Sequence, residues 1–383
     1  MKKSVKLLQE FSIPLIAGVI VALLWANLGP ESYHAIIDHE LFKGVSFHFL
    51  VNDIFMVFFF AIAAVEITQS LRPGGALNPV KKAINPLLAT AGGVLGPAAV
   101  YLALNMLIGT PELARGWGIP TATDIALAWL VARTVFGANH AAVKFLLLLA
   151  IADDGIGLFI IAIFYPDPLL PVTPIWLLLV LAGMLVAFLL KKAKVMNYWP
   201  YIIAGGLLSW FGLHNAHMHP ALALVFIVPF LPAPNRGEGE IFDATVDEHS
   251  PLTDFEHEWK VLIDFGLFFF GLANAGVGFS GIGVATWLVF IGLLVGKTVG
   301  IYGMGILAIK LGFPLPNQMG KKELLLAGIV AGLGLTVALF VAGAAFTDPV
   351  IQGAAKMGAL FSAFIAAIAI VMGKLLGIKK ADS

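Results

Sequence analysis

The sequence contains no cysteine and few charged residues. Without cysteine, its 383 residues hold no disulfide, no thiolate metal ligand and no cysteine nucleophile. Charged side chains make up 12% of the chain, against roughly 25% in soluble domains. The 23 basic residues balance the 23 acidic ones, so there is no net positive charge to attract a nucleic acid. These absences exclude a disulfide scaffold and argue against a nucleic-acid-binding protein and a soluble domain.

Long apolar runs are abundant instead. Hydrophobic residues make up 60% of the chain, and the mean hydropathy is +0.94. A helix needs about 20 mostly apolar residues to cross about 30 Å of hydrocarbon, and unbroken runs differ from the alternating strands of a membrane β-barrel. We therefore predict an all-α polytopic membrane protein with twelve transmembrane helices in one integral membrane domain over residues 1–383. The predicted spans are Ile13–Leu28, Leu50–Ile67, Ile84–Ile108, Ile119–Phe136, Ala141–Tyr165, Ile175–Leu190, Tyr198–Leu213, Pro220–Leu231, Val261–Val277, Val284–Ala308, Leu324–Phe346 and Ile351–Leu376.

The basic residues test this count, because Lys and Arg gather in cytoplasmic loops. With the N-terminus inside, nineteen of the 23 basic residues fall in cytoplasmic segments, and only Lys43 and Arg115 fall in outer loops. The pattern predicts that both termini are cytoplasmic. Residues 232–260, rich in Glu, Asp, Gly and Pro, are predicted to form an acidic cytoplasmic loop.

Three charged residues lie deep inside predicted spans. Asp153 and Asp154 stand about 13 Å along the fifth span from Lys144 at helical rise, close to the middle of the bilayer. Lys297 lies about 20 Å from Lys310, which marks the inner face. Burying such charges costs several kcal/mol, and a buried lysine needs an anion or must lose its proton. One of the two aspartates is therefore the expected partner of Lys297, and a purely structural ion pair is the alternative.

Two predicted spans carry polar or glycine-rich interruptions. The fourth contains Pro120, Thr121, Thr123 and Asp124 in an otherwise apolar segment, which is typical of a helix that breaks beside a cavity. The eleventh contains Gly328, Gly332 and Gly334, which favour either a second break or close helix packing. Paired interruptions in opposite halves of a chain indicate a transporter site.

Broken helices place partial charges inside the bilayer. Asp124 is expected to neutralise facing helix N-termini, and Lys297 to neutralise facing C-termini. Carboxylate oxygens suit Na⁺, Li⁺ or H⁺ rather than soft metals. If a cation and a proton compete for the same oxygens in a carrier with alternating access, the result is cation/proton antiport.

The same motifs resemble those of NhaA-type sodium/proton antiporters over nearly the full chain. The matching stretches are Thr123–Ala126, Asp153–Asp154, Ala273–Val277, Gly296–Lys297, Gly328–Thr336, Asn52–Asp53 and Glu66. The resemblance implies an inverted repeat that relates spans three to five to spans ten to twelve, with the interrupted spans four and eleven crossing near the site. It also implies exchange of cytoplasmic Na⁺ or Li⁺ for external H⁺, driven by the membrane potential.

Site roles follow from the resemblance residue by residue. Asp154 would be the main carboxylate for cation and proton, and Asp153 would share the cation or pair with Lys297. Thr123 and Asp124 would line the site, with Asp124 balancing helix ends.

Regulation and location are also implied. Activity in the family rises with cytoplasmic pH, and the expected sensor is Glu66 with Glu256 and His257, because histidine titrates near neutrality. Asp53 and His219 are candidates for gating. The resemblance implies a bacterial inner-membrane protein and a homodimer, although the loop Gly29–Val51 is short for the dimer-forming hairpin of the family.

Three other classes compete with antiport. A sodium-coupled symporter of a small organic anion would need solute-binding groups, and the four arginines fall in predicted loops or, for Arg133, at the inner end of a predicted span. An intramembrane aspartyl protease needs carboxylates on separate helices, whereas Asp153 and Asp154 are neighbours. A passive channel is the third alternative, but mid-membrane ion pairs mark carriers with alternating access more often. We therefore predict a transporter that is not an enzyme, needs no cofactor, and has Na⁺, Li⁺, H⁺ and the lipid bilayer as its partners.

Overall fold

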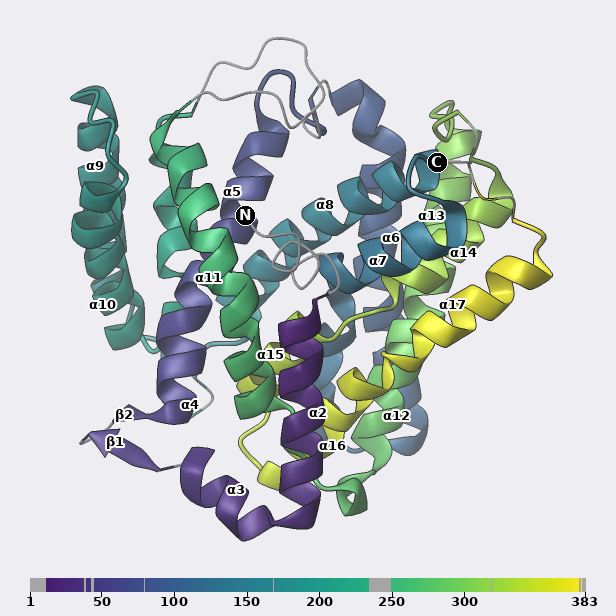
Figure 1. Cartoon of the computed structure of the whole chain (residues 1–383), viewed down its shortest axis with the longest axis horizontal. Helices are drawn as coiled ribbons and strands as arrows, with labels where there is room; N and C mark the ends of the chain where they lie inside the picture. Colours follow the sequence, from purple (N-terminus) through teal and green to yellow (C-terminus); the bar gives the residue numbers. More distant parts are fainter. Residues whose placement is uncertain are drawn as a thin grey trace.

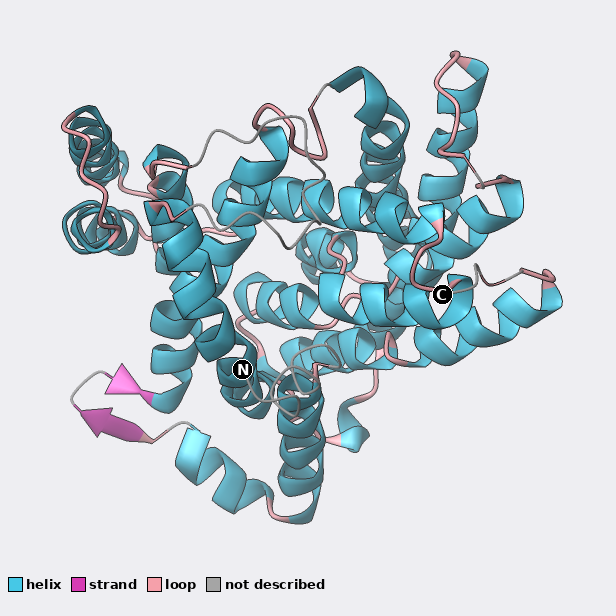
Figure 2. Cartoon of the chain, turned by 45° about the horizontal axis from the view of Figure 1, so that its top comes forward, coloured by secondary structure: helices cyan, strands magenta, loops and turns pink. Residues whose placement is uncertain are grey.

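A computed structural model describes residues 12–37, 39–42, 45–78, 80–167, 169–233, 249–317, 319–378 and 380 of the chain. Helices build almost all of it, and they run close to one another in a bundle (Figures 1 and 2). The prediction of an all-helical membrane protein is confirmed, apart from one short β-hairpin on the predicted outer side, made of β1 (Glu40–Phe42) and β2 (Val45–Ser46).

The first half of the chain contains the predicted spans one to six. Its elements are α2 (Ile13–Leu28), α3 (Pro30–Ile37), α4 (Phe47–Phe49), the π-helix η1 (Leu50–Phe55), α5 (Met56–Leu71), α6 (Val80–Ile108), the 3₁₀ segment η2 (Pro111–Thr121), α7 (Ile125–Phe136), α8 (Ala141–Phe164), η3 (Pro174–Trp176) and α9 (Leu177–Lys192).

The second half contains spans seven to twelve. Its elements are the π-helix η4 (Tyr201–Gly206), α10 (Leu207–Asn215), η5 (Pro220–Phe226), η6 (Val228–Phe230), α11 (Pro251–Asn274), η7 (Phe279–Gly281), α12 (Val284–Ile291), the π-helix η8 (Gly292–Gly296), α13 (Lys297–Lys310), α14 (Lys321–Ala331), α15 (Thr336–Ala345), α16 (Pro349–Phe361) and α17 (Phe364–Leu375).

Every predicted span is helical, but the spans differ in length. Among the described residues, six helices are long and apolar enough to cross a bilayer, or eight if each bent pair counts as one span. The other four predicted spans are shorter or more polar. Ile13–Leu28 and Pro220–Phe230 are short apolar helices, η4 and α10 together cover a short seventh span, and α11 carries charged side chains in its first half.

Both predicted interruptions are real breaks. The axis bends by 56° between η2 and α7, and by 50° between α14 and α15. Pro120 lies in the last turn of η2, and the chain is extended at Ala122 before Asp124 caps α7. In the other pair, Gly332 and Gly334 flank Leu333 between the two half-helices. Each broken helix follows one long helical segment and precedes another, so spans three to five and ten to twelve share one order.

The two groups of three spans meet where α6 packs against α13. Gly92 lies against Gly300, and Gly96 lies against Gly296, so the two helices run antiparallel, as an inverted repeat requires. A Cβ on Gly300 would lie 2.0 Å from the carbonyl oxygen of Gly92, so the backbones are in direct contact. Small residues allow such close approach in membranes, where van der Waals packing rather than the hydrophobic effect holds helices together.

The prediction that residues 232–260 form a loop is wrong at the C-terminal end of this range. Residues 234–248 lie outside the described residues, but α11 already begins at Pro251. Ser250 accepts a hydrogen bond from the amide of Thr253, whose side chain in turn accepts one from the Ser250 amide. This capping box, followed by Pro251 at the first helical position, starts the helix before the apolar run at Val261, and a search for apolar runs overlooks it.

The close contact of α6 and α13 yields a stability prediction. Gly300→Ala is expected to lower the melting temperature of the detergent-solubilised protein, because the added methyl group must push the helices apart at a cost of about 1–3 kcal/mol. Gly303→Ala in the same helix is the matched control, since a Cβ there meets no atom within 4 Å. Equal melting temperatures for the two variants would contradict the packing described above.

Candidate functional site

The two breaks cross one another. The amide of Asp124 donates a hydrogen bond to the carbonyl of Leu333 over 2.6 Å, and the Thr123 hydroxyl donates to the carbonyl of Ala331 over 2.9 Å. A Cβ on Gly334 would lie 2.7 Å from the carbonyl oxygen of Ala122. The crossing of spans four and eleven is therefore confirmed, and it joins the extended backbone at Ala122 and Asp124 to the non-helical stretch around Leu333.

Each of the three predicted glycines is closely packed. A Cβ on Gly328 would lie 3.1 Å from the backbone of Thr298 in α13, and one on Gly332 would lie 2.6 Å from the carbonyl oxygen of Leu293. Gly328 lies inside α14, whereas Gly332 and Gly334 lie in the break. The two explanations that the sequence left open both apply, packing at Gly328 and a break at the other two.

Asp124 lies where two half-helices begin. Its Oδ1 accepts a hydrogen bond from the amide of Leu127 in the first turn of α7, 3.1 Å away. Its Oδ2 accepts from the amide and the hydroxyl of Thr336, the first residue of α15, over 3.3 and 3.0 Å. A carboxylate stabilises the partial positive charge of a helix N-terminus, so these contacts are the ones that the predicted balancing role requires.

Lys297 pairs with Asp153, one of the two neighbouring aspartates. Its ammonium donates to Asp153 Oδ2 and to the Thr123 hydroxyl, each over 2.6 Å, and the lysine is 0% exposed. Among the described hydrogen bonds, Lys297 reaches a helix C-terminus through Thr123, which in turn donates to Ala331 at the end of α14. The π-helix η8 ends directly before Lys297, and such wide turns are frequent at functional sites.

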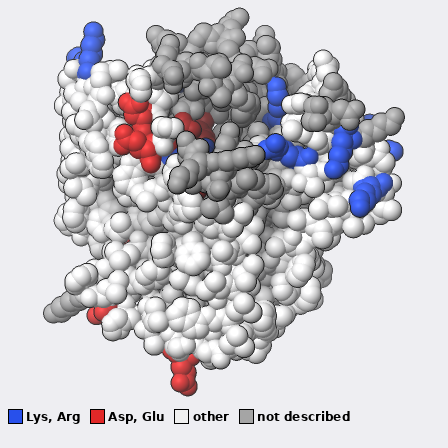
Figure 3. Space-filling model, viewed as in Figure 1, with Lys and Arg blue, Asp and Glu red and all other residues white. Residues whose placement is uncertain are grey.

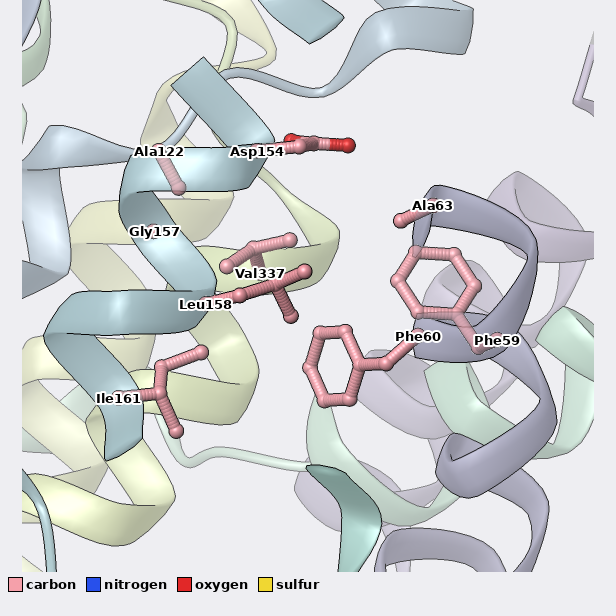
Figure 4. A pocket seen from close by; sticks show the side chains of 9 residues that line it. All are labelled: Phe59, Phe60, Ala63, Ala122, Asp154, Gly157, Leu158, Ile161 and Val337. Atoms are coloured by element: carbon pink, nitrogen blue, oxygen red, sulfur yellow. The ribbon is translucent and has the colours of Figure 1, made fainter. Parts of the chain in front are cut away.

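Asp154 is not paired with Lys297 in the described structure. Neighbouring helical positions point about 100° apart, and Asp154 faces a cavity between α8 and α5 (Figure 4). In this view its carboxylate extends from α8 towards the side of Ala63. Its Oδ1 is buried and finds no hydrogen-bond donor among the described residues. The cavity is lined by Phe59, Phe60, Ala63, Ala122, Asp154, Gly157, Leu158, Ile161 and Val337.

The predicted sensor residues are brought together only in part. Glu66 on α5 and Glu256 on α11 share Lys260, whose Nζ lies 3.4 Å from Glu66 Oε1 and 3.9 Å from Glu256 Oε1. Gln69 also donates to Glu256 Oε2 over 2.6 Å. His257 is exposed and takes no part in these contacts. Sequence reasoning overlooked Lys260 as a site residue, although its position four residues after Glu256 is the spacing of a helical ion pair.

Asp53 and His219, the gating candidates, lie near one another. Asp53 Oδ1 is 3.9 Å from His219 Nδ1. The His219 ring packs on Phe340 with ring centroids 4.5 Å apart, and Phe340 packs edge-to-face on Phe60 at 5.0 Å. Because Phe60 also lines the cavity at Asp154, two phenyl rings lie between that cavity and the Asp53–His219 pair.

Three polar residues of the site region were not assigned a role from the sequence. Thr336 binds Asp124, as described above, and Asn52 and Asn274 form a reciprocal amide pair between η1 and α11 over 2.9 and 3.3 Å. Both asparagines are buried. All three occur in the motifs that carried the family resemblance, but the positions of their partners depend on how distant helices meet.

Two broken helices that cross at a buried lysine and three buried or half-buried carboxylates define the site of a secondary ion transporter. No cluster of three His, Cys, Asp or Glu side chains able to hold a resident metal occurs in the described residues.

Comparison with known proteins identifies the family. Residues 3–374 match the model of the family Na⁺/H⁺ antiporter 1, and the chain belongs to this family. A Na⁺/H⁺ antiporter NhaA of Desulfitobacterium hafniense is 69% identical over 379 residues, covering 99% of this chain and 97% of that one. One of Geobacter sulfurreducens is 64% identical over 380 residues, covering 99% and 100%. The structure of a sodium proton antiporter of Methanocaldococcus jannaschii shares the fold, with a TM-score of 0.58 and 16% identity over 96% of this chain and 92% of that one.

The buried ion pair yields a second prediction. Lys297→Ala strands the Asp153 carboxylate, and breaking a buried pair in this way costs about 3–5 kcal/mol, so the melting temperature should fall. The double variant Lys297→Ala/Asp153→Asn removes both charges and should recover most of the loss. Thermal unfolding of the two variants in detergent measures this difference. If the double variant were no more stable than Lys297→Ala, the unpaired Asp153 carboxylate would not be the cause of the lower stability, and the ion-pair explanation would fail.

Proposed function

We propose that this antiporter exchanges cytoplasmic Na⁺ for external H⁺ by letting the two ions compete for the Asp154 carboxylate. The single observation that carries the proposal is the difference between the two neighbouring aspartates. Asp153 is paired with Lys297, whereas Asp154 faces a cavity with a buried oxygen that has no hydrogen-bond donor in the described structure. A buried carboxylate without a partner is costly, so a cation or a proton must occupy it.

This cost couples the two ions. The ionised, empty Asp154 is the least favourable form of the site inside the bilayer, because its charge has no compensation there. Binding of either ion removes that penalty, and the two ions exclude each other because they use the same oxygen atoms. A carrier that changes its accessible side only with Asp154 occupied therefore exchanges one ion for the other and does not leak.

Neighbouring groups complete the proposed site. Sodium and lithium ions prefer hard oxygen ligands, and Asp153 Oδ1 is a second buried carboxylate oxygen without a donor. We assign Asp153, Thr123 and Asp124 to the lining of the site, with Lys297 and Asp124 compensating the half-helix ends. Lithium is expected to be a second substrate, because it makes the same contacts.

Charge movement and regulation follow from the same groups. Electrogenic exchange needs a second proton for each Na⁺ bound, and we assign it to the buried Lys297–Asp153 pair, which shares one proton beside Asp154. The Glu66–Lys260–Glu256 cluster at the inner ends of α5 and α11 supports sensing of cytoplasmic pH there. The Asp53–His219 pair, separated from the Asp154 cavity by Phe60 and Phe340, supports a gate on the outer side.

The orientation in the membrane is inferred from charge. On the face drawn in Figure 3, Lys and Arg gather towards the upper end, while only acidic groups are seen at the lower end, where α3 and the hairpin lie (Figures 1 and 3). By the positive-inside rule the upper end is cytoplasmic. We propose one transporter domain in the bacterial inner membrane with both termini cytoplasmic. The exposed Leu41 and Phe42 of the outer hairpin support its use in a homodimer.

The role of Asp154 is tested by substitution. Asp154→Asn is expected to abolish Na⁺-dependent proton movement in everted membrane vesicles, because an amide neither releases a proton nor carries the charge that holds Na⁺. Asp348→Asn is the matched control, since Asp348 is an exposed helix cap and asparagine caps a helix equally well. Normal Na⁺-dependent exchange by Asp154→Asn would overturn the assignment.

Competition also predicts how transport depends on pH. Where Asp154 is protonated most of the time, each unit of acidification raises the proton concentration tenfold, so the apparent KM for Na⁺ should rise about tenfold. The maximal rate at saturating Na⁺ should change much less over the same interval. Initial rates at a series of Na⁺ concentrations between pH 6 and pH 9 separate the two quantities. An apparent KM that is independent of pH while the maximal rate falls would show that the proton acts elsewhere.

A further inference from the structure

Buried tyrosine hydroxyls hold the outer half of the broken fourth span. Tyr101 on α6 donates a hydrogen bond to the carbonyl of Leu113 over 2.8 Å. Tyr165, at the end of α8, donates to the carbonyl of Arg115 over 2.7 Å and accepts from the amide of Gly118 over 2.8 Å. Both tyrosines are at most 2% exposed. The backbone of η2 is thus bonded by side chains to both long helices beside it.

The fit around these hydroxyls is tight. A Cβ on Gly116 would lie 2.3 Å from the Tyr101 hydroxyl oxygen, and one on Gly118 would lie 2.6 Å from that of Tyr165. Glycine lets each hydroxyl reach the backbone. Arg115 adds a further link, since its guanidinium donates to the carbonyl of Pro166 just beyond α8 over 2.8 Å.

The two tyrosines differ in what they connect. Tyr165 forms the C-terminal cap of α8, the helix that carries Asp153 and Asp154, whereas Tyr101 belongs to α6. The amide that Tyr165 holds, Gly118, lies in the last turn of η2, and the Thr121 hydroxyl donates to the carbonyl of the same residue over 2.7 Å. The chain then runs through Ala122 directly to Thr123.

Thr123 can move very little without losing a hydrogen bond of its hydroxyl. Its hydroxyl must lie within hydrogen-bond distance of both Lys297 Nζ, at 2.6 Å, and the carbonyl of Ala331, at 2.9 Å. A small shift of η2 along α8 would break one of these bonds and alter the distances between Thr123, Lys297 and Asp153. The hydroxyl of Tyr165, the one polar group of its side chain, is therefore used to hold the segment that sets this geometry.

We propose that Tyr165 is a positioning residue for ion binding, which fixes the outer half-helix η2 to the helix of the two aspartates, with Tyr101 fixing the same segment to α6. This inference rests on the proposed function, because it assigns Tyr165 an effect on the site formed by Asp154 and its neighbours. Tyr165 does not touch the ion. Its loss changes how well the site fits a cation of given radius.

The test is the kinetics of Tyr165→Phe in proteoliposomes, with Na⁺ and with Li⁺ as substrates. Groups that orient the ligands of a metal typically change affinity about 10- to 100-fold when they are removed, so the KM for Na⁺ should rise about tenfold while the maximal rate is largely kept. The KM for Li⁺ should change by a different factor, since the two ions differ in radius. Tyr101→Phe should act in the same direction, and Tyr302→Phe on α13, which is half-buried, serves as the control.

A second variant covers the case in which Tyr165→Phe does not fold. Gly118→Ala places a methyl group against the Tyr165 hydroxyl and should produce the same change in the ratio of the two KM values. If the folded variant kept the same ratio of the KM for Na⁺ to the KM for Li⁺, whatever its melting temperature, Tyr165 would have a structural role alone. That result would overturn the inference. If instead the unmodified protein shows no Na⁺-dependent proton movement, the proposed function fails first.

Discussion

The arrangement of the site depends on the ion pair between Lys297 and Asp153. Both side chains are completely buried, and the distance between the charged atoms is 2.6 Å. In water such a pair would contribute little, but in the middle of a bilayer neither charge is stable alone. By neutralising Asp153, Lys297 leaves Asp154 as the carboxylate that needs an external cation. The neighbouring aspartates therefore serve different purposes, although the sequence presents them as equals.

The crossed half-helices supply the second condition. They bring backbone groups without helical partners to the centre of the membrane, where these groups must be satisfied. Asp124 binds the N-terminal turns of α7 and α15, and Thr123 joins the end of α14 to Lys297. Displacement of any of these segments would therefore break at least one hydrogen bond of the network. The same bonds that stabilise the breaks thus make the site sensitive to the relative position of the two groups of helices.

Sequence reasoning predicted the segments and the chemistry better than the contacts. The apolar runs predicted where the helical segments lie, and Pro120, Thr123, Gly332 and Gly334 predicted both breaks, because these are local properties of the chain. The start of α11 was misplaced, since its signal is a cap at Ser250 and not an apolar run. The choice of Asp153 as the partner of Lys297, the contact of Thr336 with Asp124 and the contact of Lys260 with Glu66 depend on side chains that are far apart in sequence. No local pattern reveals such pairs until the helices are packed.

The most direct measurement for the central claim is proton release on Na⁺ binding to the purified protein in weakly buffered detergent solution. Na⁺ is added at a pH where the Asp154 carboxyl is protonated. If Na⁺ displaces this proton, the amount of protons released should rise with the amount of Na⁺ bound and then reach a plateau. The released amount should vanish in Asp154→Asn, whereas Asp348→Asn should behave like the unmodified protein. Saturable Na⁺ binding with no proton release at any pH between 6 and 9 would contradict competition at this carboxylate.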